Sequence, residues 1–471
     1  MRFSKNVIRK SILLTLVLSM FIFNACDEEV KFEGDAAINK WIYDNMKYYY
    51  LWTDEIPTNY DLTLQPEDFF ESILSDKDEY SGIQKDYEKL LKSLQGVNKE
   101  AGFEFVLYRE SETSDNVIMQ IVYIKPNSPA SSTTLKRGDI ITTINGTLIT
   151  RNNYLTLLEQ MSNNFSITYR AIDLNTETFG SATTLNLAPV EYSENPNYLS
   201  SVITIGNKKI GYYLYNFFAT GPSSNSSEYN NQMDNIFAEF KAQGITDLVL
   251  DLRFNSGGAE TATRNLASLI GAGVTTNNIF AKRKYNDQLT EDLTNDPKYG
   301  PEFFNTRFVS KTQNIGSQLD NFIILTSSRS ASASELLING LKPYMDVFII
   351  GDVTFGKNVG SISIYQPNDP NNTWGMQPIV VQSFNANDES DYSDGFSPNI
   401  LLKDNDLMLQ PLGNQNERLL SKALEVIAGP PTIAARKQDS RYERMEIGNS
   451  HDFKRIKAPM LFDAKNLFLP E

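Results

Sequence analysis

The apolar run Asp247–Leu252 constrains the fold of this 471-residue chain more than any other segment. It is nearly continuous, which is typical of a strand buried on both faces of a parallel sheet. Similar short runs at 210–215, 321–326 and 347–350 alternate with helical patterns. Because strands that alternate with helices favour a sheet covered by helices, we expect an α/β core over residues 192–429.

Two other patterns precede this core and one follows it. Residues 26–95 carry aromatic side chains at helical spacings, which predicts a linker and a small α-helical N-terminal domain. Residues 97–190 change to short β-branched runs, among them 117–124 and 140–144, that end at turn residues. This pattern predicts a β domain that precedes the core or is inserted into it. Residues 430–471 form a C-terminal tail.

The first 25 residues have the pattern of a secretory signal, with basic residues, an apolar run at 12–23 and a small residue before a break. A membrane span needs about 20 apolar residues, so this run is too short for one. Cys26 follows directly, and its surroundings resemble the lipobox at which bacterial lipoproteins are lipidated. We therefore expect a lipid anchor at Cys26, with the protein in the cell envelope at the outer membrane. A plain secretion signal with an incidental cysteine is the alternative.

The acidic residues 27–29 come immediately after this cysteine. They resemble the surface-export signal of Bacteroidetes-type lipoproteins. A solvated linker has the same composition, so both interpretations stay open.

The composition excludes several kinds of site. The chain has one cysteine and one histidine, His451, so it cannot form a cysteine-rich zinc module, and a Ser-His-Asp triad depends on that single tail residue. The formal net charge of −15 argues against nucleic-acid binding, which needs a basic face. A hydrolase with this sequence works without imidazole, thiol or a histidine-bound metal, and we expect no metal or other cofactor.

The motif at 330–335 (SASASE) lies between the predicted strand 321–326 and a helical pattern that runs to Leu341. A serine at the start of a helix is close to unpaired N–H groups and to the positive end of the helix dipole, which stabilise a developing oxyanion. Ser332 is therefore a candidate nucleophile. The spacing of Ser332 and Glu335 is also that of a capping box, which needs no catalysis.

A lysine and a glycine turn supply further candidate groups. Lysine titrates near 10.4, but burial lowers the pKa by up to roughly 3–5 units, which makes Lys357 a candidate general base. Gly257 and Gly258 follow the run 247–252 and precede a helix from Glu260. Because glycine lets N–H groups approach a substrate closely, this turn can supply half of an oxyanion hole. Taken alone, the lysine is typical of a surface residue and the glycines of an ordinary turn.

Together these motifs resemble the C-terminal processing, or tail-specific, serine peptidases. That family carries a D-L-R-x-N-x-G-G turn, an S-A-S-A-S-E helix start and an F-G-K segment, found here in this order at 251–258, 330–335 and 355–357. The stretch 394–400 is similar to a further segment of the family. The resemblance implies an α/β fold with a crotonase- or ClpP-like spiral catalytic core.

The resemblance also implies a role for each matching residue. Ser332, the middle serine of its motif, is the nucleophile, and Lys357, 25 positions later, is the base. The N–H of Ala333 and that of Gly257 or Gly258 hold the oxyanion, and the match does not choose between the two glycines.

Three further serines are assigned by position. Ser330 and Ser334 have structural or supporting roles. Many members carry glutamine four residues after the lysine, where this chain has Ser361. A serine hydroxyl can hydrogen-bond the amine directly or through a water, so we expect this role for Ser361. Weaker or conditional activity is the alternative consequence.

Within the β domain, residues 126–146 closely resemble a PDZ domain. Gly102, Phe103, Glu104 and Phe105 stand where such domains have their carboxylate-binding loop and the adjoining strand, to which a peptide adds as a further strand. We expect peptide binding at these residues. A β domain that only packs or regulates is the alternative.

We therefore predict a serine endopeptidase of the cell envelope that cleaves unfolded or C-terminally exposed polypeptides with a Ser/Lys dyad. Its expected partners are a polypeptide, bound through its C-terminus, and the membrane, through the lipid anchor at Cys26. A non-catalytic envelope lipoprotein that binds peptides is the first alternative, and hydrolysis of a non-peptide ester is the second. Removal of His451 is expected to leave catalysis intact.

Overall fold

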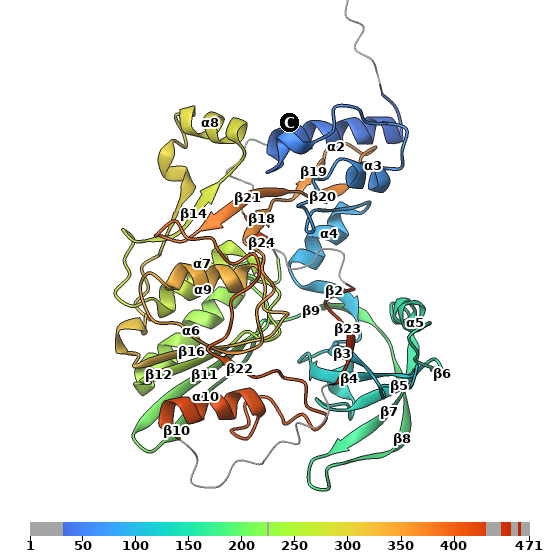
Figure 1. The fold of residues 1–471 in the computed structure, drawn as a ribbon, viewed down its shortest axis with the longest axis vertical. Coiled ribbons are helices and arrows are strands. Elements are labelled where there is room, and N and C mark those ends of the chain that lie inside the picture. Colours follow the sequence, from blue (N-terminus) through green and yellow to red (C-terminus); the bar gives the residue numbers. More distant parts are fainter. Residues whose placement is uncertain (1–31, 224–225, 430–443, 454–459, 463–471) are drawn as a thin grey trace, which may run out of the picture.

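Three units make up the part of the chain that the computed structural model describes: a group of N-terminal helices, a β domain and an α/β core (Figure 1). The described residues are 32–223, 226–429, 444–453 and 460–462. The predicted signal segment and Cys26 lie outside them. Among the described helices, none combines the length and the apolar character that a membrane crossing requires.

A six-stranded sheet forms the centre of the core, in the order β10-β11-β12-β16-β17-β22. All neighbouring strands are parallel except β10 and β11. Every residue of β12 (Asp247–Asp251) is buried, as the apolar run predicted, and the α/β fold class is confirmed. The other strands are β10 (Asn197–Ile205), β11 (Lys208–Tyr215), β16 (Asn321–Thr326), β17 (Phe348–Gly351) and β22 (Ile400–Leu401).

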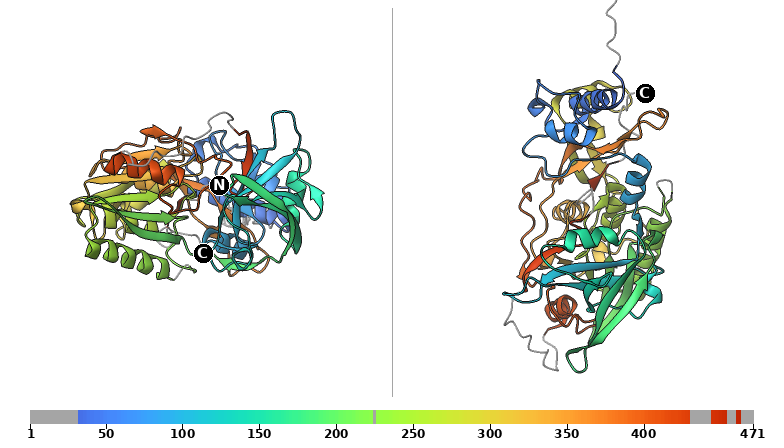
Figure 2. Two further views of the ribbon diagram at one scale, coloured as in Figure 1. Left: turned by 90° about the horizontal axis from the view of Figure 1, so that it is seen from below. Right: turned by 90° about the vertical axis from the view of Figure 1, so that its right-hand side faces the viewer.

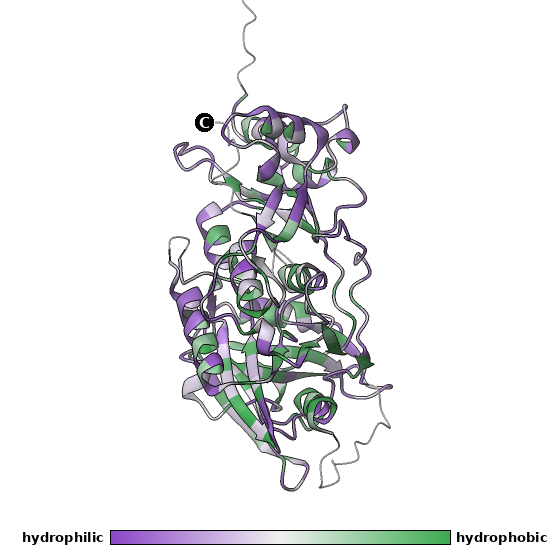
Figure 3. Cartoon of the chain, turned by 90° about the vertical axis from the view of Figure 1, so that its left-hand side faces the viewer, coloured by the Kyte–Doolittle hydropathy of each residue, from purple (hydrophilic) through white to green (hydrophobic). Residues whose placement is uncertain are grey.

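Helices cover both faces of this sheet. Leu248 and Leu250 of β12 belong to the hydrophobic cluster that includes α6, α7 and α9, whereas Val249 belongs to the cluster that includes α10. This alternation follows the two-residue period of a strand. In Figure 3 the strands of the sheet are hydrophobic over most of their length. The helices are α6 (Glu228–Gln243), α7 (Glu260–Ile270), α9 (Ala333–Leu341) and α10 (Arg418–Ala428).

A second six-stranded sheet has the order β13-β24-β18-β21-β14-β15. Its strand β24 (Met460–Leu461) lies between β13 (Gly258–Ala259) and β18 (Val359–Ser361) and is parallel to both. Part of the segment predicted as a separate tail therefore belongs to the core, because its main chain completes a sheet. The remaining strands are β21 (Ile379–Phe384), β14 (Ile279–Lys284) and β15 (Asn305–Arg307), with α8 (Asp287–Asn295) between the last two in sequence.

The N-terminal helices pack against one end of the core, as the right-hand view of Figure 2 shows. In α2 (Asp35–Tyr49), Ile42 and Met46 are four residues apart, fully buried and part of the larger core cluster. The small helical domain predicted from the aromatic pattern is confirmed. It also contains α3 (Pro66–Ser72) and α4 (Tyr87–Leu94), and a three-stranded sheet of β1 (Gly82–Gln84), β20 (Gly375–Gln377) and β19 (Ile364–Tyr365) links it to the core.

The β domain lies beside the core (Figure 2, left) and has the antiparallel order β23-β3-β4-β5-β7-β8. Strands β4 (Val117–Ile124) and β5 (Ile140–Ile144) have the bounds that the sequence predicted. The edge strand β23 (Glu446–Asn449) again comes from the C-terminal region and pairs with β3 (Phe103–Arg109). The other elements are β2 (Val97–Glu100), β6 (Thr147–Leu148), α5 (Tyr154–Gln160), β7 (Phe165–Asp173), β8 (Thr178–Leu187) and β9 (Val190–Ser193).

Candidate active site

Ser332 lies immediately before the first residue of α9. Its φ of 59° and ψ of −106° fall in a region that costs a non-glycine residue about 1–3 kcal/mol and persists only where packing imposes it. The side chain is fully buried, and its Oγ has no hydrogen-bond partner among the described residues. A buried hydroxyl without a partner destabilises a fold, which favours a functional over a structural interpretation of Ser332.

Glu335 joins the main chain at Ser332 to the main chain at Lys357. Its Oε2 accepts the N–H of Ser332 at 2.7 Å and the N–H of Lys357 at 2.8 Å, so the two nitrogens are at most 5.5 Å apart, the sum of these distances. Ser332 and Glu335 are arranged as a capping box in which the Glu335 carboxylate accepts the Ser332 N–H, while the serine Oγ makes no hydrogen bond within the described residues. The carboxylate thus orders the turn.

The other oxygen of Glu335 holds the segment that leads to the lysine. Oε1 accepts the Gly356 N–H at 2.6 Å and the Thr354 hydroxyl at 2.6 Å. Burial raises the pKa of Glu335 to about 7, although these hydrogen bonds act in the opposite direction. The sequence identified Glu335 only as a capping residue; its spacing from Ser332 was the available signal, and its contacts with 354–357 were not predictable from it.

The Lys357 side chain is only 1% exposed. Burial disfavours the ammonium and lowers the pKa of Lys357 to about 7, even though the negative charges of Asp78 and Glu335 act against the shift. The Lys357 Nζ lies 4.7 Å from the ring centroid of Tyr80. Asp78 and Tyr80 come from the stretch before β1, and the sequence analysis missed both because no local pattern connects them to a lysine of the core.

The glycine turn distinguishes its two N–H groups. The Gly257 N–H donates to Asn255 Oδ1 at 3.0 Å and is therefore occupied. The Gly257 carbonyl and the Ala259 N–H both bond to Phe218, at 2.8 Å each. Because successive groups of a strand point to opposite sides, the Gly258 N–H points away from Phe218, toward β24. We favour Gly258 over Gly257 as a donor to an oxyanion, because its N–H lies on the side where a neighbouring strand pairs, whereas the Gly257 N–H is held by a side chain of its own turn.

Gly258 is also the position at which the turn requires glycine. Its φ is +134°, and a Cβ there would lie 2.1 Å from the Phe218 carbonyl oxygen. The close approach of the two main chains is thus possible only without a side chain. The Ala333 N–H is in the first turn of α9, where N–H groups have no acceptor within the helix, so it is available as a second donor.

Two serines fix the helix start against the glycine turn. The Ser330 hydroxyl donates to the Leu252 carbonyl at 2.8 Å, and the Ser334 hydroxyl donates to the Asn255 carbonyl at 2.9 Å. The Ala331 N–H also donates to Asn255, at 3.1 Å. These bonds hold the two candidate oxyanion donors on one rigid frame, and both serines make structural contacts of the kind expected.

Comparison with known proteins places this geometry in a family. The family model for the Peptidase family S41 matches residues 209–401, and the model for the Peptidase S41 N-terminal domain matches residues 37–82, a range that includes Asp78 and Tyr80. The chain belongs to peptidase family S41. The predicted relationship to the C-terminal processing peptidases is confirmed, and the S41 chain is a serine-type peptidase.

Solved structures with a similar fold include two peptidases. A putative S41 protease from Bacteroides fragilis NCTC 9343 is 27% identical with a TM-score of 0.68, and the match covers 83% of this chain and 97% of that chain. The photosystem II D1 C-terminal processing protease is 17% identical with a TM-score of 0.49, and the match covers 85% of this chain and 99% of that one.

The Ser361 hydroxyl of this S41 chain points toward β20 and β24. It donates to Gln377 Oε1 at 2.9 Å and lies 3.4 Å from the main-chain oxygen of Met460. The expected role of Ser361 toward the Lys357 amine stays a prediction. No triad forms through the single histidine: His451 Nε2 lies 3.7 Å from Glu104, and the Ser332 hydroxyl has no partner among the described residues.

The predicted peptide-binding residues lie at the start of β3. Gly102 has a φ of +89°, and its carbonyl accepts the Lys125 N–H at 2.9 Å. Glu104 is buried and forms an ion pair with Lys125 at 2.9 Å. Phe103 and Phe105 are buried in the cluster of the β domain. Strand β23 pairs with β3 just beyond this stretch, at residues 106–108, and Ser450 reaches the Phe105 carbonyl at 3.0 Å.

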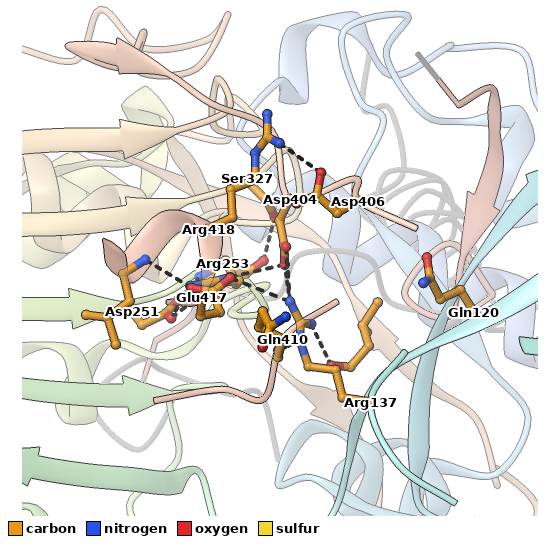
Figure 4. Close-up of polar contacts among 12 residues, drawn as sticks. Gln120, Arg137, Asp251, Arg253, Ser327, Asp404, Asp406, Gln410, Glu417 and Arg418 are labelled. Atoms are coloured by element: carbon orange, nitrogen blue, oxygen red, sulfur yellow. Dashed lines mark hydrogen bonds and ion pairs between the residues drawn. The ribbon is translucent and has the colours of Figure 1, made fainter. Parts of the chain in front are cut away.

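A buried charge cluster fixes the strand that precedes the glycine turn (Figure 4). Arg253 is fully buried and forms ion pairs with Asp251 at 2.8 Å, Glu417 at 2.6 Å and Asp404 at 3.1 Å. Arg137 of the β domain pairs with the same Asp404 at 3.0 Å. The cluster therefore connects the glycine turn, α10 and the β domain, and the sequence analysis did not identify it.

Proposed function

We propose that this chain is an endopeptidase of the cell envelope that hydrolyses unfolded or C-terminally exposed polypeptides with a Ser332–Lys357 dyad. One observation supports this function above the others. The Glu335 carboxylate ties a strained, fully buried serine, whose hydroxyl has no partner among the described residues, to a buried lysine with a pKa lowered to about 7. Neither the strain nor the burial of the amine stabilises the fold.

In this mechanism the neutral amine of Lys357 takes the proton of the Ser332 hydroxyl as Oγ attacks the scissile carbonyl. The carbonyl oxygen becomes an oxyanion, which the N–H groups of Gly258 and Ala333 stabilise. The Lys357 ammonium then gives its proton to the leaving amine, and the peptide C–N bond breaks. Water, deprotonated by the same amine, hydrolyses the ester on Ser332 and restores both groups.

The test replaces each member of the dyad. We expect Ser332→Ala and Lys357→Ala each to lower hydrolysis of an unfolded protein by about 10³-fold or more, because the two groups act as one unit. Exposed neighbours provide matched controls: Ser328→Ala and Lys403→Ala keep wild-type rates. Undiminished turnover by either dyad variant contradicts the mechanism. Turnover of a small ester with protein substrates left intact identifies an esterase instead.

We also propose that Cys26 carries the lipid that attaches the chain to the envelope. The support is the signal pattern that ends at this cysteine, which is the chain's only thiol. In cells supplied with labelled palmitate, the wild-type chain is expected to take up label and to sediment with membranes. The Cys26→Ser variant should do neither, and a labelled Cys26→Ser chain would refute the anchor.

A further inference from the structure

The two dyad residues are closed to a substrate in the described structure. Ser332 is 0% exposed and Lys357 is 1% exposed. A polypeptide reaches the hydroxyl only if a segment that covers it moves. Two C-terminal strands lie beside the stretches at which we expect a polypeptide to bind. Strand β23 lies beside β3, and β24 lies beside the glycine turn.

Strand β24 fills the gap between the glycine turn and the strand after Lys357. Gly258 pairs with Met460 and Ser361 pairs with Leu461, both in parallel register. The Phe462 N–H donates to the Ser361 carbonyl at 3.1 Å. Because β13 and β18 do not pair with each other, the two edges form a slot for one extended chain, which adds to both through main-chain bonds.

Side chains on either side of β24 fill the slot further. Met460 is fully buried, and its Sδ lies 3.6 Å from the Ser383 hydroxyl. The Phe462 ring lies 4.9 Å from the Arg283 guanidinium and covers Gly360, where an added Cβ would be 2.0 Å from the ring. The slot therefore accepts an extended segment with large apolar side chains.

Strand β23 pairs with β3 directly beside the predicted peptide site of the β domain, and Ser450 after it reaches that site at Phe105 and Glu104. It runs antiparallel to β3, and beyond its end the Ser450 N–H donates to the Phe105 carbonyl at 3.0 Å. The Phe453 ring lies 6.4 Å from the ring of Phe105 and 6.3 Å from the ring of Tyr154 in α5. Figure 1 shows β23, in dark red, against the β domain, and β24 beside β18.

The charges at the start of β3 fit a chain that continues past this point. Lys125 is surrounded by three carboxylates, those of Glu100, Glu104 and Glu194, at 2.8, 2.9 and 3.0 Å. The one ammonium is already outnumbered, so it does not favour a free C-terminal carboxylate. The hydroxyl of Ser450 instead donates to Glu104. A segment with a hydroxyl at this point suits the site better than a chain that ends there.

One cavity extends from the start of β3 to the glycine turn. Its volume is about 710 Å³, and its lining includes Gly102 and Phe105 of the β domain, Gly257 and Gly258 of the glycine turn, and Ser450. One polypeptide can therefore lie along β3 and reach the glycine turn within this cavity.

We propose that β23 and β24 are a tethered occupant of the two polypeptide-binding sites, which a substrate must displace before it can pair with β3 and with the glycine turn that precedes α7. This inference rests on the proposed peptidase function. Because both strands belong to one chain, binding of one strand raises the local concentration of the other at its own site. A substrate therefore competes best when it engages both sites.

The test uses the full chain with Met460→Asp, which puts a charge at a buried position of β24 and is expected to release the strand. We expect hydrolysis of an unfolded reporter protein to rise about tenfold, because a buried methionine side chain no longer holds the slot closed. Leu401→Asp is the matched control, since Leu401 is 64% exposed and the same change there leaves the rate unaltered.

A second measurement does not depend on catalysis. With Ser332→Ala in both chains, a fluorescein-labelled peptide of residues 444–462 is expected to bind the Met460→Asp chain about tenfold more tightly than its parent, because a vacated site needs no displacement. Fluorescence anisotropy measures the two affinities. If no chain hydrolyses the reporter, the proposed function fails, while the peptide affinities alone confirm or overturn the occupant.

Two outcomes overturn the inference, provided that the amides of β12 and β16 stay protected from hydrogen exchange. The first is that Met460→Asp leaves both hydrolysis and peptide affinity at parental values. The second is that it lowers both, which would mark β24 as a structural strand. Where Met460→Asp loses protection in β12 and β16, Phe462→Ala takes its place. That variant removes the contacts with Arg283 and Gly360, and we expect a smaller gain, about threefold.

Discussion

Two cationic side chains of this molecule are equally buried and have opposite pKa shifts. Arg253 is 0% exposed, and Asp251, Glu417 and Asp404 hold its pKa well above the usual value despite the burial. Lys357 is 1% exposed, and burial lowers its pKa to about 7. The difference lies in the carboxylates: three lie within 3.1 Å of the arginine, whereas Glu335 directs its oxygens to main-chain N–H groups and a hydroxyl.

The comparison shows how one domain can hold a permanent charge and a titratable base at similar depth. Arginine cannot serve as a base, and its planar group satisfies several carboxylates at once, so it suits a structural cluster. Lysine changes its pKa readily when buried. In this S41 chain Glu335 orders the turn through the Lys357 main-chain N–H, and burial of the amine leaves a large fraction of it neutral at about pH 7.

The largest effect is expected at the arginine. Arg253→Ala leaves three buried carboxylates without their shared cation, and we expect the free energy of unfolding to fall by about 3–5 kcal/mol. Lys357→Met is the matched variant, because it keeps the apolar stem and removes an amine that is largely neutral at pH 8; its expected change is under about 1 kcal/mol. Urea unfolding at pH 8 measures both, and equal losses would break the comparison.

An intermediate effect is expected at the carboxylate. Glu335→Gln keeps one acceptor oxygen and faces the remaining N–H donors with an NH₂ group, so the turn that aligns Ser332 with Lys357 loosens. We expect hydrolysis to fall about 100-fold while unfolding free energy falls by only about 1–3 kcal/mol. Glu425→Gln on α10, whose side chain is 39% exposed, is the control. An unchanged rate in Glu335→Gln would show that the carboxylate only caps the helix.

The smallest effect is a pH dependence. Only the neutral amine can take the serine proton, so kcat/KM of the wild type should rise about tenfold per pH unit below the inflection and level off above it. The inflection is expected at about 7, the lowered pKa of Lys357. Histidine is the residue type whose ordinary titration falls closest to this pH, so His451→Ala is the necessary control. Loss of the inflection in His451→Ala would assign it to the imidazole.

The sequence predicted those parts of the fold that depend on local pattern. Strands β4, β5 and β16 have the expected bounds, because each is a β-branched or apolar run that ends at turn residues. The order of the motifs around Ser332 and Lys357 was sufficient to predict the family. These features are predictable from the sequence because residues close together in the chain determine them.

Other parts depend on contacts between distant segments. Strands β13 and β24 have two residues each, too few for a pattern, and their pairing is set by the surrounding sheet. Asp78 and Tyr80 reach Lys357 from another domain, more than 270 positions away in sequence. Ser361 was assigned from its position in a motif, whereas the direction of its side chain follows from the strand that carries it.

The position of β24 has a consequence for how this protein is made. Residue 460 pairs with residue 258, so about 200 residues separate the two partners, and closing so long a loop is slow compared with local structure formation. Synthesis proceeds from the N-terminus, and β13 and β18 are complete before β24 leaves the ribosome. Insertion of β24 is therefore expected as a late kinetic step. Until then, the newly synthesised chain has no strand between β13 and β18.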